Sequence, residues 1–83
     1  MANLETAVEA YRRAEDAVAR AQVDAQALVE AARQQRTQAR ERLAEAIVAA
    51  ARGGARQVDL VKITGYTRET IRRILRAGGI EAD

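Results

Sequence analysis

Apolar residues in the first third of the chain recur at alternating steps of three and four positions. This spacing is the seven-residue repeat of a coiled coil, in which two positions per repeat face a partner helix. Most of the positions between them carry charged residues or glutamine. The pattern predicts a long amphipathic helix with one apolar seam. The seam consists of Leu4, Ala7, Tyr11, Ala14, Val18, Ala21, Ala25, Leu28 and Ala32.

Polar side chains take over the seam positions between Arg33 and Gln38, so we expect the coiled coil to end or splay there. Neither Pro nor Gly occurs before position 53, so no residue forces the helix itself to stop. A single alanine-rich helix buries little area and is marginal in water. We therefore expect residues 1–39 to join two chains into a homodimer, parallel or antiparallel. The alternative is a helix that folds back on the C-terminal part of its own chain.

A second apolar pattern begins near residue 40 and predicts another helical segment. Leu43, Ala46, Ile47 and Ala50 share one helix face, which stops at a pair of glycines. The first of these, Gly53, can take the left-handed conformation that closes a helix. Residues 40–83 are thereby expected to form a domain of their own.

Two short helices are predicted after the glycine pair. The first covers 57–63, with Val58, Leu60 and Val61 turned inward, and a turn at 64–66 ends it.

The last helix has clear start and stop signals. Thr67 is a good N-cap residue, and glycines at 78–79 end the helix. Tyr66 before the cap and Ile71 after it are spaced for a hydrophobic staple, which fixes the angle at which the chain enters the helix. The predicted fold is therefore all-α, with a long N-terminal helix of coiled-coil type followed by a three-helix domain.

Residues 57–76, QVDLVKITGYTRETIRRILR, resemble the helix-turn-helix signature of bacterial DNA-binding proteins. The ninth position of that signature is a turn glycine, which here is Gly65. The fifth position is usually alanine, whereas this chain has Val61, which slightly wider packing between the two helices could absorb. The apolar positions four, ten, fifteen and eighteen of the signature are Leu60, Tyr66, Ile71 and Ile74.

The segment RQVDLVKITGYTRETIRRI is also similar to small helix-turn-helix proteins of actinobacteria. Among them are a GATC-binding nucleoid-associated family and regulators of phages and plasmids. The resemblance implies a dimer that binds double-stranded DNA, as a transcriptional regulator or as a nucleoid organiser. For the nucleoid-associated family it implies binding at many short genomic sites.

The distribution of charge agrees with this expectation. Residues 1–39 carry a net charge of −1 and residues 40–83 a net charge of +3. Four arginines and one glutamate lie between Thr67 and Ala77. Arginines in such a stripe bind phosphate and release condensed counterions. A charged face that is merely solvated is the alternative.

A helix-turn-helix places its last helix in the major groove with the N-terminal residues toward the base edges. Arginine can donate two hydrogen bonds to guanine, and Glu69 can accept one from cytosine. Stabilisation of the helix N-terminus is the alternative role of Glu69. The expected base-reading residues are Thr67, Arg68, Glu69, Arg72 and Arg73. The expected phosphate-contacting residues are Arg56, Gln57, Lys62, Thr70 and Arg76.

The composition excludes several other functions. The chain has no Cys and no His, which excludes disulfides, thiolate or imidazole metal sites and the usual nucleophile systems. We expect no metal, no cofactor, no small-molecule ligand and no enzymatic activity. No basic N-terminal region with an apolar run is present, so a cytoplasmic protein is expected. The resemblance implies that it acts at the nucleoid. The competing function is a protein-interaction module that docks on RNA polymerase or another regulator.

Overall fold

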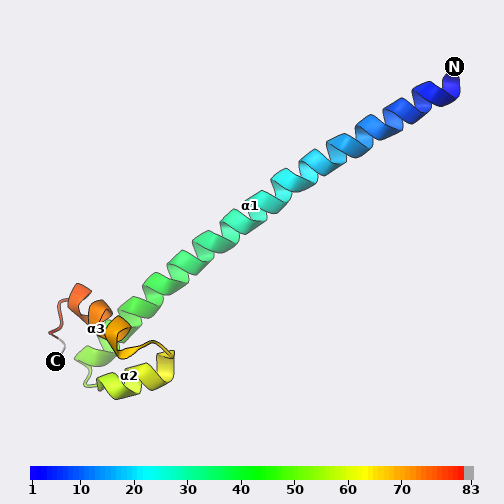
Figure 1. The fold of residues 1–83 in the computed structure, drawn as a ribbon. Coiled ribbons are helices and arrows are strands. Elements are labelled where there is room, and N and C mark those ends of the chain that lie inside the picture. Colours follow the sequence, from blue (N-terminus) through cyan, green and yellow to red (C-terminus); the bar gives the residue numbers. More distant parts are fainter. Residues whose placement is uncertain (82–83) are drawn as a thin grey trace. The chain divides into compact units, whose positions relative to one another are not determined.

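The computed structural model describes residues 1–81, which form three helices and no strand (Figure 1). Helix α1 spans Ala2–Arg52, α2 spans Gln57–Thr64 and α3 spans Arg68–Ala77. The all-α prediction is confirmed, with one long N-terminal helix followed by two shorter ones. The first helix of the predicted three-helix domain is the C-terminal part of α1, which continues through the polar stretch at 33–38.

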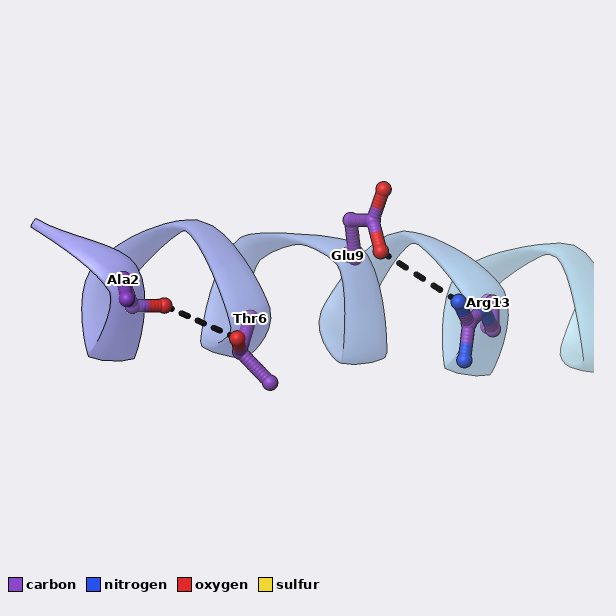
Figure 2. Close-up of polar contacts among 4 residues, drawn as sticks. All are labelled: Ala2, Thr6, Glu9 and Arg13. Carbon is purple, nitrogen blue, oxygen red and sulfur yellow. Dashed lines mark hydrogen bonds and ion pairs between the residues drawn. The ribbon is translucent and has the colours of Figure 1, made fainter.

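The chain divides into two units, Met1–Gln35 and Arg36–Asp83. The first unit is a single stretch of helix in which every residue is exposed. Polar side chains of this unit make contacts with residues one helical turn away. The Thr6 hydroxyl donates to the Ala2 carbonyl at 2.8 Å, and Arg13 Nη2 donates to Glu9 Oε2 at 3.3 Å (Figure 2). Exposed pairs one turn apart stabilise a helix by only about 0.2–0.5 kcal/mol each.

The second unit has the hydrophobic core. Among its described residues, 36–81, four large side chains are buried, one from α1, one from α2 and two from α3: Ile47, Leu60, Ile71 and Leu75. Tyr66 and Val61 are partly buried and pack against this cluster. Val61, which stands where the helix-turn-helix signature usually has alanine, therefore lies at the edge of the core.

Two details of the predicted core were wrong. Leu43, Ala46 and Ala50 of α1 are exposed, and Val48 and Ala51 pack against the core beside Ile47 instead. In α2, Val58 is exposed rather than turned inward.

The glycine that closes α1 also differs from the prediction. Gly54, with φ 102°, takes the positive-φ conformation, and Gly53 does not. The Gly54 amide donates to the Ala51 carbonyl and the Ala55 amide to the Ala50 carbonyl, both at 3.0 Å. This pair of bonds is a Schellman motif, which satisfies carbonyls at the end of the helix.

The C-terminal ends of α1 and α3 lie against each other at Gly78. Arg52 Nη2 donates to the Gly78 carbonyl at 2.9 Å. A Cβ atom on Gly78 would lie 2.5 Å from Val48 Cγ2. Because the branched Val48 side chain is stiff, only glycine fits this crossing without a shift of one helix.

Replacing Gly78 with Ala should therefore lower the free energy of unfolding of the second unit by about 1–3 kcal/mol, the usual cost of overpacking. Gly53→Ala is the matched control, because its Cβ would meet nothing closer than 3.5 Å and its φ is ordinary. This control should be neutral or stabilising by up to about 1 kcal/mol. Urea unfolding of both variants gives the comparison, and equal stabilities would show that the crossing at Gly78 is not tight.

Candidate nucleic-acid interface

The turn between α2 and α3 is held by hydrogen bonds from two residues. Gly65 has φ 74°, and its amide donates to the Val61 carbonyl at 2.9 Å. The Thr64 hydroxyl donates to the Leu60 carbonyl at 2.6 Å and accepts from the Tyr66 amide at 3.1 Å. The left-handed glycine is the usual end of a helix, because other residues are strained there. The turn thus fixes where α3 begins.

Thr67 is the N-cap of α3, as predicted. Its hydroxyl oxygen accepts from the Thr70 amide at 3.2 Å, and the hydroxyl donates to Thr70 Oγ1 at 2.9 Å. The single proton of the Thr67 hydroxyl is therefore used within the chain. Any contact from this group to an outside molecule is restricted to accepting a hydrogen bond.

Helix α3 has one buried face and one arginine-rich face. Ile71 and Leu75 are buried, with exposed fractions of 0% and 2%, and Ile74 is partly buried beside them. Arg73 lies about 200° around the helix from Ile71, given 100° per residue. The exposed charged residues of α3 are Arg68, Glu69, Arg73 and Arg76. These four residues, together with Arg72, are called the arginine face below.

Arg72 lies at the border between the two faces. It is half-buried, and its Nε atom is enclosed without a hydrogen-bond partner in the part of the chain that the structure describes. Its aliphatic stem is therefore covered by protein, as is common for long basic side chains. A covered stem has fewer rotamers, so this guanidinium has less freedom to lose on binding than that of an exposed arginine.

The positive charges of the arginine face are hardly neutralised by acidic side chains of the same helix. Within residues 1–81, no ion pair joins Glu69 to an arginine of α3. Arg73 Nη2 instead donates to Thr70 Oγ1 at 3.4 Å. The face thus carries four positive charges and one negative charge over three helical turns. Such an arrangement attracts polyanions.

The predicted phosphate contacts outside α3 differ in exposure. Arg56, the N-cap residue of α2, is exposed but lies 3.5 Å from Asp59, which partly offsets its charge. Lys62 is exposed, and Gln57 is half-buried. Lys62 is therefore the α2 cation that is best placed for an outside anion.

A shallow hollow of about 430 Å³ lies between the C-terminal part of α1 and α3. Its lining includes Val48, Arg52, Ile74 and Gly78. None of the arginines of α3 lines it, so the hollow and the arginine face are separate features of the second unit.

Comparisons with family models, curated proteins and solved structures gave no match to this chain. Among residues 1–81, no helix has a stretch long and apolar enough to cross a bilayer.

Proposed function

We propose that this chain is a sequence-specific DNA-binding protein that acts as a dimer and inserts α3 into the major groove. It would serve as a transcriptional regulator or as an organiser of the bacterial nucleoid. The observation that carries the proposal is the division of α3 into a buried apolar face and an exposed arginine face directly after a capped helix-turn-helix turn. A helix must have both faces to be held by its own domain while it contacts bases.

The side chains divide into two groups in this proposal. Arg68, Glu69 and Arg72 lie toward the N-terminal half of α3, which approaches the base edges in this motif. Arg76 lies in the last turn of the helix and would contact phosphate, as would Lys62. Phosphate contacts position the domain but do not read sequence.

A salt titration of DNA binding tests the proposal against the protein-interaction alternative. The affinity for a duplex should fall linearly with salt on logarithmic axes, with a slope of about −0.9 for each phosphate contact. Fluorescence anisotropy with a labelled duplex gives this slope. An affinity for duplex DNA that is absent, or insensitive to salt, would support docking on RNA polymerase or another protein instead.

Two arginine variants then separate base reading from phosphate contact. Arg72→Ala should reduce discrimination between a selected duplex and a scrambled one by about 1–3 kcal/mol, because a base contact is lost. Arg76→Ala is the matched control, and it should weaken binding to both duplexes alike and make the salt slope shallower by about 1. The selected duplex comes from enrichment of a random library. Equal loss of discrimination in the two variants would contradict these roles.

A further inference from the structure

The first unit exposes an apolar stripe whose large and small side chains are unevenly placed. Within residues 4–28 the seam has large residues at Leu4, Tyr11, Val18 and Leu28, and alanine at the other positions. All of them are exposed. No charged residue occupies the seam, so covering it does not bury a charge. The order of large and small residues then determines which pairing of two helices packs evenly.

A parallel pair in register would pack this seam poorly. Each residue would meet its own copy, so Tyr11 would oppose Tyr11 of the partner subunit, and Ala14 would oppose the partner's Ala14. The bulky layers would hold the helices apart, and the all-alanine layers beside them would leave gaps. Gaps of this kind lose dispersion contacts, because protein interiors are close-packed.

An antiparallel pair has one register in which the sizes match. When paired residues have numbers that add up to 32, Tyr11 meets the partner's Ala21 and Val18 meets the partner's Ala14. Ala7 meets the partner's Ala25, and Leu4 meets the partner's Leu28 at both ends. Each bulky residue in the middle of the segment thus faces an alanine. The contacts are reciprocal, as a two-fold axis requires.

The two neighbouring antiparallel registers, each shifted by one heptad, cover the large seam residues less completely. A shift in one direction places Leu4 against Gln35 of the partner subunit. A shift in the other direction moves Leu28 past the N-terminus of the partner, so that no residue covers it. Only the intermediate register covers every large seam residue with an apolar one.

We propose that residues 4–28 pair with the same residues of a second copy in this antiparallel register. The inference deepens the proposed function, because it depends on the dimer and specifies its geometry. The accessible surface of the chain is 6988 Å². At the average area per residue, covering eight seam residues on each of the two chains removes on the order of 1,300 Å² from water. That area lies at the lower end of the range for stable interfaces.

This geometry also determines the ends of the paired segment from which the two chains continue. The two chains leave the paired segment at opposite ends, which are roughly 36 Å apart at 1.5 Å per residue. The two copies of α3 then follow from opposite ends of the pair.

Cysteine cross-linking in the full chain tests the register, because the natural sequence has no cysteine. Ala7→Cys and Ala25→Cys are small changes at exposed helix positions. After mild oxidation, a mixture of the two variants should give a covalent dimer of one chain of each, and neither variant alone should give one. Disulfides require Cα atoms within about 7 Å, so the reaction discriminates between registers. Ala14→Cys mixed with Ala25→Cys is the control for a shift of one heptad, and it should give no product.

Each other outcome overturns the inference in its own way. A covalent dimer from Ala7→Cys alone or Ala25→Cys alone would establish a parallel pair, and a product from the control mixture would establish the shifted register. No product in any sample, together with a dimer in sedimentation equilibrium, would mean that another surface pairs the chains. A monomer in sedimentation would refute the dimer itself, while the salt titration described above tests DNA binding independently.

Discussion

Replacement of Ile71 with Ala is expected to unfold most of the second unit at room temperature. Ile71 is 0% exposed and belongs to a core that, within residues 1–81, has four buried hydrophobic side chains. Truncating a buried isoleucine to alanine costs about 2–5 kcal/mol. A unit of this size has a total stability of a few kcal/mol, at about 0.05–0.15 kcal/mol per residue. The loss is therefore comparable with the whole free energy of unfolding.

Ile63→Ala is the matched control for this prediction. It makes the same chemical change at a residue that is 82% exposed. The control should change the free energy of unfolding by less than about 0.5 kcal/mol. Urea unfolding followed through the backbone amide signals of α2 and α3 measures both variants. Similar midpoints for the two variants would contradict the core described above.

Deletion of residues 1–33 is expected to convert the proposed dimer into a monomer and to weaken the proposed binding to long DNA by about 10²- to 10⁴-fold. The reason is that the second binding event of a linked pair occurs at a high effective concentration, which the deletion removes. Binding to a short duplex with a single selected site should change little. Sedimentation equilibrium and anisotropy measurements on the two kinds of DNA test these expectations.

Two full-length variants control for effects of the deletion other than the loss of the seam. Val18 and Val23 are 59% and 68% exposed, and only Val18 belongs to the seam. Val18→Asp should behave like the truncated protein, because it places a charge in the paired surface. Val23→Asp should behave like the unaltered chain. If both variants remain dimeric, the seam is not the dimer interface.

The features of the fold that follow from local chemistry could be predicted from the sequence. The cap at Thr67 and the turn at Gly65 each depend on one residue type with a specific backbone role. The buried Ile71 follows from the spacing of apolar residues in α3, because the surrounding arginines leave only one apolar face. The charge distribution of α3 follows from the same spacing.

Residues whose positions depend on packing between helices could not be predicted. The stretch from Ala46 to Ala51 is apolar on every side, so its periodicity does not show which face turns inward. In α2, Leu60 and Val58 lie about 160° apart around the helix, so both cannot be buried, and the larger residue occupies the core. The polar Gln57 and Thr64 lie on the inner face of α2 together with Leu60. The inner face of α2 therefore does not stand out as a pattern of apolar residues.

The contacts at Gly78 gave no signal in the sequence. These contacts depend on how closely α1 and α3 approach each other. They join residues that are far apart in the chain. The enclosure of the Arg72 stem was missed for the same reason, since an arginine in a basic stripe is expected to point into solvent.

The crossing at Gly78 also bears on how a complex with DNA would form. Arg52 and Val48 of α1 contact Gly78, the residue directly after α3. These contacts, with the buried Ile71 and Leu75, oppose tilting of the helix within its own unit when it enters a groove. In the proposed complex the duplex has to adapt instead, by widening or bending, and sequences that deform easily would be favoured even at base pairs that no side chain touches.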